Sequence, residues 1–466
     1  MARASLRLLA ALAGATLLCP PASAAPAKVD PAWHAQMMDI WKKMIAIPTV
    51  QGRGQMPAMT RYIADILKKG GFAAEDIIVE GEGDATTIVA RYRGASATGK
   101  SVLLAGHMDV VEAKPSDWER DPFTPIEENG FLYGRGSFDT KFGNAAMVTS
   151  LVKLKQEGFR PSRDIVMVLS ADEETAMETT ARLADKYAPG AELLLNTDAG
   201  GGLLDGESKP VAYMLQAAEK TYADFEISVT DPGGHSSRPG ASNAIYGLSR
   251  AIDRIAAYSF PAQADELTRA YFRATGKQVG GPTGAAMLRF ADDPTDKVAL
   301  ATLRTLPEYV GQTGTTCVAT MLAGGHALNA LPQKASVSVN CRIFPGVSID
   351  SVKAVLRKVI DDPKAVITTL GKPLASPGSP LRRDLLKAVR RGLDLSYPGL
   401  AIVPQMSVGA TDSIYFRAKG VPSYGIGGVF INPDDDFSHG LNERVPLASV
   451  DPGLLLIKTV IAEMAK

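Results

Sequence analysis

The sequence predicts an α/β protein whose mixed sheet, flanked by helices, is split by an inserted ferredoxin-like α+β domain. Short apolar runs alternate with helical patterns in the first and last parts of the chain, which is typical of a sheet covered on both faces. Between residues 216 and 375 the strands instead alternate apolar with polar residues, as in a sheet with one wet face. The 466 residues, 45% of them hydrophobic, suffice for two or three domains.

The first part of the α/β domain is assigned to residues 25–215. A helix is predicted around Met147, Leu151 and Leu154, which share one helical face, and Gly158 ends it. Apolar runs predict four buried strands around this helix, at residues 87–90, 101–105, 165–169 and 193–195.

The inserted domain is assigned to residues 216–375. It is predicted to hold a strand at 222–229, a helix striped by Ile245 and Leu248, a hairpin at 317–343, and a helix striped by Val352 and Val355. This strand–helix–strand–strand–helix order is ferredoxin-like. Residues 259–314 interrupt it and are predicted as helix plus loop.

Residues 376–466 return to the α/β pattern. A helix is expected at 382–393 and an apolar segment at 421–426. This last segment is assigned to the second half of the split α/β domain.

The N-terminus has the pattern of a cleavable signal peptide over residues 1–24. Arg3 and Arg7 precede an apolar run at 8–18, and Ala22-Ser23-Ala24 resembles a cleavage site. Lipidation at Cys19 is rejected, because Leu18 stands where a lipoprotein signal has Gly or Ala. No other stretch is long and apolar enough for a bilayer, so we expect a secreted or periplasmic protein without a membrane partner.

The charge balance argues against a nucleic-acid partner. The chain has 50 Lys+Arg against 50 Asp+Glu and no long basic run. Binding to phosphates requires clustered positive charge.

Two cysteines remain after export, Cys317 and Cys341, on either side of the predicted hairpin. They could face each other across the ladder, and disulfides persist outside the cytosol. Because disulfide geometry is demanding, we favour two separate buried thiols.

Acidic and histidine residues follow the predicted strands. His107 and Asp109 come after strand 101–105, Glu173-Glu174 after strand 165–169, and Asp198 after strand 193–195. Each has an ordinary reading alone, such as a helix cap, a solvated acidic loop or a core histidine. Together they lie where open α/β sheets place their ligand crevices.

With Asp139, in a Gly-rich turn, and His439, near the C-terminus, the group includes two histidines and three carboxylates, with further acids beyond that set. Such a set suits two zinc ions joined by one bridging carboxylate, with a further acid free as a base. Glu173-Glu174 supplies one ligand and one proton carrier.

The segments at 106–111, 134–141, 172–174 and 439–443 resemble the motifs of the M20 metallopeptidase family. The family includes carboxypeptidase G2-type enzymes, dipeptidases, aminoacylases and PM20D-type N-acyl amino acid hydrolases. The resemblance implies a zinc-peptidase-type catalytic domain with a lid, and two Zn²⁺ per chain, with Co²⁺ or Mn²⁺ as substitutes. Thr140 stands where many members carry Met or Asp, which we expect to be harmless because in the family the cis backbone at that position, rather than the side chain, shapes the site.

The resemblance also assigns roles. It places His107 and Asp198 on one zinc, Glu174 and His439 on the other, and Asp139 between them. Asp109 is expected to orient His107, and Glu173 to act as general base and acid.

Further residues, all but Gly409 in the inserted domain, resemble the family's substrate contacts. His235 matches a histidine that polarises the scissile carbonyl, often in the neighbouring subunit's site, and Asn329, Arg342 and Gly409 match positions that contact substrate. A guanidinium holds a carboxylate through two parallel hydrogen bonds, so Arg342 indicates a substrate with a free carboxylate. The alternative is that His235 is only a histidine of a turn and that Arg342 is only a surface arginine.

We therefore expect an exported di-zinc hydrolase of small peptides, of the carboxypeptidase or dipeptidase type. The alternative is an N-acyl-L-amino acid amidohydrolase. A metal-stabilised binding protein is disfavoured, because neither a ligand nor the base is missing. Family members often dimerise through the lid, so a homodimer is a further expectation.

Overall fold

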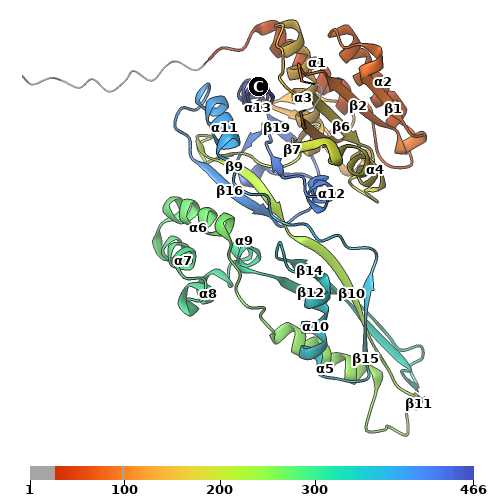
Figure 1. Ribbon diagram of the computed structural model, residues 1–466. Coiled ribbons are helices and arrows are strands. Elements are labelled where there is room, and N and C mark those ends of the chain that lie inside the picture. The colour runs from red at the N-terminus through yellow and green to blue at the C-terminus, as the bar shows by residue number, and fades with distance from the viewer. Residues whose placement is uncertain (1–26, 97–98) are drawn as a thin grey trace, which may run out of the picture.

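The computed structural model describes residues 27–96 and 99–466. The predicted signal peptide at 1–24 lies outside the described residues. Figure 1 shows two bodies, an α/β domain that contains both chain ends of the described part and a smaller domain below it. We call the smaller body the lid. No helix in the described ranges is both long and apolar enough to span a bilayer.

A ten-stranded mixed sheet organises the α/β domain. Strands β6, β3, β7 and β17 run parallel in its centre, and β2 and β1 complete one edge with antiparallel pairing. The strands of this sheet, in spatial order, are β1 (Ile77–Glu80), β2 (Thr87–Tyr92), β6 (Ile165–Ser170), β3 (Ser101–His107), β7 (Ala191–Asn196), β17 (Ser423–Gly425), β9 (Pro210–Glu219), β8 (Gly201–Leu204) and β18 (Phe430–Ile431), with β16 (Ile402–Ser407) also paired to β9.

Helices cover both faces of this sheet, which explains why its central strands read as continuous apolar runs. In β3, Val102 and Leu104 belong to one buried cluster while Leu103 and Ala105 belong to another on the opposite face. The first face packs mainly against five helices and the second against two. The first five are α1 (Pro31–Ile45), α2 (Met56–Lys69), α3 (Phe142–Gln156), α11 (Arg383–Asp394) and α13 (Val450–Met464), and the other two are α4 (Glu178–Tyr187) and α12 (Ser413–Ala418).

A three-stranded antiparallel sheet joins distant segments of the α/β domain. It is ordered β19 (Arg444–Pro446), β5 (Phe131–Tyr133), β4 (Ile126–Glu128). The pairing of β19 with β5 brings the segment after His439 beside the turn that leads to Asp139.

The lid is a four-stranded antiparallel sheet with two helices on one face. The sheet is ordered β12 (Thr316–Gly324), β14 (Lys334–Ile343), β10 (Thr221–Thr230), β15 (Ala365–Leu370). Its inward residues pack against α5 (Ala244–Ala257) and α10 (Ile349–Ile360). A short ribbon of β11 (Gly234–His235) and β13 (Ala330–Leu331) lies at the far end of the lid in Figure 1.

Residues 259–314 contain more helix than the sequence indicated. They form α6 (Glu266–Val279), α7 (Gly281–Asp292), α8 (Lys297–Leu303) and α9 (Pro307–Val310). Phe272, Met287 and Phe290 form a small separate core with Leu303. The prediction of helix plus loop was correct in kind but missed this core.

The lid and the α/β domain share a nearly continuous strand. β9 ends at Glu219 and β10 begins at Thr221, so Lys220 alone separates them. Figure 1 shows this path running from the upper body into the lower one.

The predicted fold class is confirmed, and each predicted strand and helix in the described residues overlaps an observed element. The structure adds β15, which completes a β–α–β–β–α–β order in the lid. The domain boundaries at 215/216 and 375/376 remain predictions.

The preference for two free thiols was wrong: Cys317 and Cys341 form a disulfide. They are directly paired residues of β12 and β14, with Cα atoms 4.1 Å apart. The antiparallel register supplies the proximity that sequence spacing alone left open.

We expect this disulfide to stabilise the lid. Replacing both Cys317 and Cys341 by Ala should lower the free energy of unfolding by about 2–4 kcal/mol, because the unfolded chain loses its cross-link. Thermal unfolding with and without reductant measures the effect. Reductant should leave the double variant unchanged, and an equal response of both proteins would contradict the assignment.

Candidate metal centre

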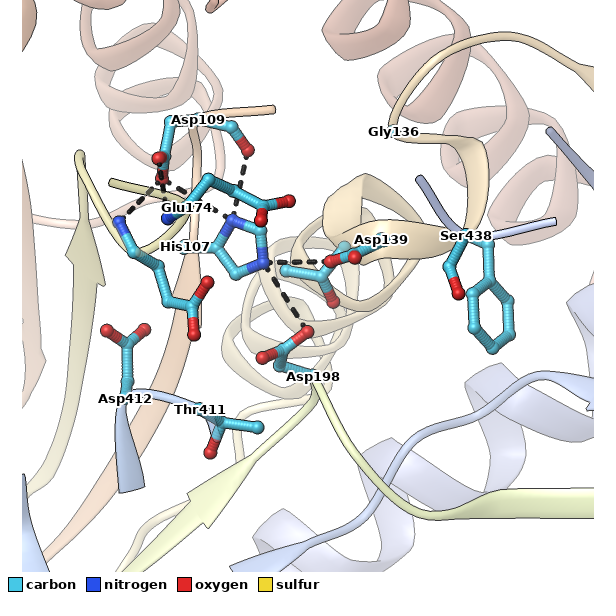
Figure 2. Close-up of polar contacts among 12 residues, drawn as sticks. His107, Asp109, Gly136, Asp139, Glu174, Asp198, Thr411, Asp412 and Ser438 are labelled. Carbon is cyan, nitrogen blue, oxygen red and sulfur yellow. Dashed lines mark hydrogen bonds and ion pairs between the residues drawn. The ribbon is translucent and has the colours of Figure 1, made fainter. Parts of the chain in front are cut away.

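Three parallel strands bring the predicted site residues to one edge of the sheet. β3 pairs in parallel with β6 on one side and β7 on the other. His107 is the last residue of β3, Glu173 and Glu174 lie in the loop after β6, and Asp198 follows β7. Figure 2 shows His107, Glu174 and Asp198 gathered there.

Asp139 lies between the two histidines. Its Oδ1 is 2.9 Å from Nε2 of His107, and its Oδ2 is 3.0 Å from Nε2 of His439. The Asp139–Thr140 peptide bond is cis. One carboxylate thus offers an oxygen to each imidazole, which is the arrangement of a bridging ligand.

The other two acids divide between the imidazoles. Asp198 Oδ1 lies 3.4 Å from His107 Nε2, and both carboxylate oxygens of Glu174 lie 3.0 Å from His439 Nε2. His107, Asp139 and Glu174 offer donor atoms that all lie within 4.8 Å of one another. The structure therefore brings all five predicted ligands together as two groups that share Asp139.

These acids lack the usual cationic partners. Among the described residues, none of Asp139, Glu174 and Asp198 forms an ion pair with a lysine or arginine. In the part of the chain that the structure describes, their positive partners are the imidazoles of His107 and His439. The site therefore holds more negative charge than its protein neighbours balance.

The imidazoles respond to this charge. Burial opposes protonation of His107, but the charge of Asp198 and hydrogen bonds to Asp109 and Asp139 raise its pKa well above the ordinary value. Hydrogen bonds to Asp139 and Glu174 raise the pKa of His439 to about 10. Burial raises the pKa of Asp198 to about 7.

This donor set fits divalent cations. Imidazole nitrogens and carboxylate oxygens are ordinary ligands of Zn²⁺, and metal ligation uses the neutral imidazole. Cations here would neutralise the acids without requiring protonated histidines. His107, Asp198 and Asp139 would hold one ion, and His439, Glu174 and Asp139 the other.

Asp109 supports both His107 and the loop of residues 171–177 between β6 and α4, which we call the acidic loop. The Nδ1 atom of His107 is 3.0 Å from the backbone oxygen of Asp109 and 3.4 Å from its carboxylate. The same carboxylate accepts the backbone N–H groups of Glu173 and Glu174 at 3.1 and 3.0 Å. Asp109 thus has a wider set of contacts than the orienting role predicted for it.

The three consecutive acids have different surroundings. Asp172 accepts hydrogen bonds from the backbone N–H groups of Glu178 and Thr179, and so caps the start of α4. Glu173 has its backbone held by Asp109, and burial raises the pKa of its side chain well above the ordinary value. Only Glu174 contacts an imidazole directly.

Glu443 is a supporting residue for which the sequence indicated no role. It is fully buried and paired with Arg135, with 2.6 Å between Nη1 and Oε2. It accepts the backbone N–H groups of Gly136, Phe138 and Asp139 at 2.9, 2.8 and 3.0 Å. Glu443, which lies four residues after His439, therefore fixes the turn that carries Asp139. Its place in the motif at 439–443 was the only signal in the sequence.

A cavity of about 330 Å³ opens beside this centre. Its walls include the acids of the site, apolar side chains and the segment after β16. Prominent among them are Asp139, Glu173, Glu174, Asp198 and His439, with Phe138, Phe142, Val429, Gln405, Ser407 and Thr411.

The cavity wall does not include the predicted substrate-contacting residues His235, Asn329, Arg342 and Gly409. His235 is exposed in β11, and its Nδ1 contacts Ser237, while the Asn329 carbonyl accepts the N–H of Ser236 at 3.0 Å. Figure 1 shows β11 remote from β6 and β7. Arg342 and Gly409 instead lie near the junction, where Arg342 Nη1 donates to the Val408 carbonyl at 3.1 Å.

Comparisons with known proteins give independent information about this chain. The model of peptidase family M20/M25/M40 matches residues 103–463. N-fatty-acyl-amino acid synthase/hydrolase PM20D1 of Mus musculus is 26% identical, over 91% of this chain and 87% of its own length. Probable carboxypeptidase S-like 2 of Dictyostelium discoideum is 26% identical, over 78% of this chain and 71% of its own.

A solved structure supports the fold. The YXEP protein of Bacillus subtilis, described as a dinuclear metal binding peptidase of the M20 family, superposes with a TM-score of 0.59. It is 13% identical, and the match covers 94% of this chain and 99% of that one. The family model spans most of the chain and includes every predicted metal ligand, so the chain belongs to the M20/M25/M40 peptidase family and is a metal-dependent amide hydrolase.

Proposed function

We propose that this chain is an exported di-zinc hydrolase that cleaves the amide bond of small peptides with a free C-terminal carboxylate. The observation that carries the proposal is the position of Asp139, with one oxygen toward His107 and the other toward His439. Glu173, the acid that is not assigned to a metal ion, lines the same cavity next to Glu174.

Two zinc ions at this centre would polarise the amide carbonyl and activate water. Nitrogen and oxygen donors also suit Co²⁺ and Mn²⁺, so these ions are the expected substitutes. The relative from Bacillus subtilis, described as dinuclear, supports a count of two.

Glu173 is the proposed proton carrier. Its raised pKa favours the uptake of a proton from the attacking water, and its place on the cavity wall allows delivery of that proton to the leaving nitrogen. Asp109 holds the backbone of Glu173, so the carboxylate starts from a fixed support.

Arg342 is the proposed partner of the substrate carboxylate. It lies at the junction of lid and sheet, where its guanidinium stacks 4.7 Å from the Tyr222 ring and uses one N–H on Val408. The remaining N–H groups suit a carboxylate. The backbone of Gly409, next to Val408, is proposed as a further substrate contact.

The second candidate is an N-acyl-L-amino acid amidohydrolase. The similarity to PM20D1 of Mus musculus over 91% of this chain favours it. Both candidates cleave an amide bond and release an amino acid with a free carboxylate. They differ in the acyl group that is attached to its nitrogen.

Export is supported by two features. The sequence has the signal-peptide pattern at 1–24, and the lid contains the Cys317–Cys341 disulfide, a cross-link typical of oxidising compartments.

We further propose a homodimer through the lid, with His235 acting in the partner's site. β12 is an edge strand that exposes Val318, Met321 and Leu322, with exposed fractions of 60%, 71% and 71%. Exposed apolar edges are typical protein contact surfaces. The position of His235, remote from its own centre, is explained if it serves a second copy.

Glu173→Gln should slow turnover strongly while metal binding remains. We expect kcat to fall by about 10²–10⁴-fold, because the proton carrier is lost, while each chain still binds two zinc ions. Elemental analysis of the protein and steady-state kinetics measure the two effects. Glu178→Gln, an exposed neighbouring acid, is the control; loss of metal in Glu173→Gln would contradict the role of an unligated base.

A substrate panel decides between the two candidates. Zinc-loaded enzyme is expected to hydrolyse dipeptides with a higher kcat/KM than N-fatty-acyl amino acids. Amidation of the substrate's C-terminal carboxylate should raise KM, and this increase should vanish in Arg342→Met. A preference for fatty-acyl substrates would establish the second candidate.

Complementation tests the role of His235. His235→Ala should lower kcat/KM by about 10²–10³-fold, since a donor to the developing oxyanion is removed. Unfolding and refolding it together with Glu173→Gln should restore part of the activity, because a mixed dimer contains one complete site. Monomers by light scattering, or no recovery on mixing, would refute the shared site.

A further inference from the structure

Asp412 is a buried carboxylate beside the metal centre that has no role in the mechanism above. Asp412 is 2% exposed and forms no ion pair with any described lysine or arginine. It immediately precedes α12, where an aspartate ordinarily caps the helix, but its side chain makes no capping bond. Burying an ionisable group in this way is costly, so its contacts require an explanation.

Asp412 instead joins the two ends of the loop that carries Glu173 and Glu174. The Ser170 hydroxyl, at the end of β6, donates to Oδ2 of Asp412 at 2.9 Å. The Thr180 hydroxyl, in the first turns of α4, donates to Oδ1. The proton carrier and one predicted ligand lie between these two anchors.

The same loop is held from the other side by Asp109, which accepts the backbone N–H groups of Glu173 and Glu174. Asp109 thus fixes the middle of the loop, while Asp412 fixes its ends. Figure 2 shows Asp109 above His107 and Asp412 below it in this view, with the Asp412 carboxylate directed toward the site.

The residues just before Asp412 are held by the lid side of the molecule. Three successive carbonyls, those of Met406, Ser407 and Val408, each accept a hydrogen bond. The donors are Gln312 Nε2 at 2.9 Å, the N–H of Lys220 at 3.0 Å and Arg342 Nη1 at 3.1 Å. Lys220 is the residue that joins β9 to β10, and Arg342 lies in β14.

Thr411 adds a side-chain connection to the same junction. Its hydroxyl donates to Glu219, the last residue of β9, and Glu219 is paired with the buried Arg417 at 2.8 Å. We call residues 406–412 the link segment. One end of the link segment is bound to the lid junction, and the other is bound to the acidic loop.

We propose that Thr411 and Asp412 are positioning residues, through which the lid junction sets the place of Glu173 at the metal centre. Asp412 acts by tying Ser170 to Thr180, and Thr411 acts by tying the link segment to Glu219. This proposal rests on the proposed function only in naming Glu173 as the proton carrier.

The test compares variants that break the two anchors of the acidic loop. Asp412→Asn, Ser170→Ala and Thr180→Val should each lower kcat, with Asp412→Asn the largest at about 10²-fold, because misplacing a catalytic group is sufficient for such a loss. KM and bound metal should stay at wild-type values. The combined Asp412→Asn and Thr180→Val variant should be no slower than Asp412→Asn alone, since both substitutions disrupt the same hydrogen bond, between Thr180 and Asp412.

Thr60→Val is the matched control for Thr180→Val. Thr60 and Thr180 are both helical threonines with 1% exposure, but the Thr60 hydroxyl bonds only within α2. Its variant should lose thermal stability without a change in kcat. Thr411→Val should lower kcat, whereas Thr411→Ser, which keeps the hydroxyl, should have the wild-type kcat.

Hydrogen exchange gives a readout that does not depend on turnover. In Asp412→Asn, the amides of residues 171–178 should exchange faster, while those of residues 139–145 stay unchanged. Unchanged exchange at 171–178, an additive loss in the combined variant, or an equal kcat for Thr60→Val and Thr180→Val would overturn the proposal. If wild-type protein hydrolyses no amide in the panel, the proposed function fails, and the exchange result still decides the role of Asp412. If Asp412→Asn does not fold, Thr180→Val provides the same exchange test.

Discussion

Uncompensated negative charge at one edge of the sheet is the constraint around which this molecule is built. Asp139, Glu174 and Asp198 converge without a lysine or arginine among the described residues, and burial makes this convergence more costly. Cations satisfy such a site, and the family's metal dependence agrees with it. Much of the surrounding polar structure serves to hold these acids against their mutual repulsion.

The support comes from further buried acids. Glu443 gathers three backbone N–H groups around Asp139, and Asp109 gathers two around Glu173 and Glu174. These hydrogen bonds fix the backbone that carries Asp139, Glu173 and Glu174, and they do not use the side-chain oxygens of those three acids. A fixed backbone suits a site where geometry decides reactivity.

Where burial produces a local pattern of apolar residues, the sequence predicted the fold correctly and indicated the candidate site. The central strands read as apolar runs because both faces are covered, and the residues that follow them are the site residues. Contacts between distant segments left no such pattern: Arg135 and Glu443 are 308 residues apart, and Ser170 and Asp412 are 242 apart. The Cys317–Cys341 pairing and the core around Phe272 likewise depend on register and packing, which spacing alone does not reveal. Of the supporting acids, Asp109 was therefore predicted from its place beside His107, whereas the contacts of Glu443 and Asp412 appear only in three dimensions.

Asp139 places its two oxygens on opposite partners, and this has a thermodynamic consequence for occupancy. An ion bound on the His107 side would fix the carboxylate in the orientation that the His439 side also needs. By reciprocity, the second ion would tighten the hold on the first by the same factor. Occupancy of the two positions would then be coupled through Asp139 rather than independent.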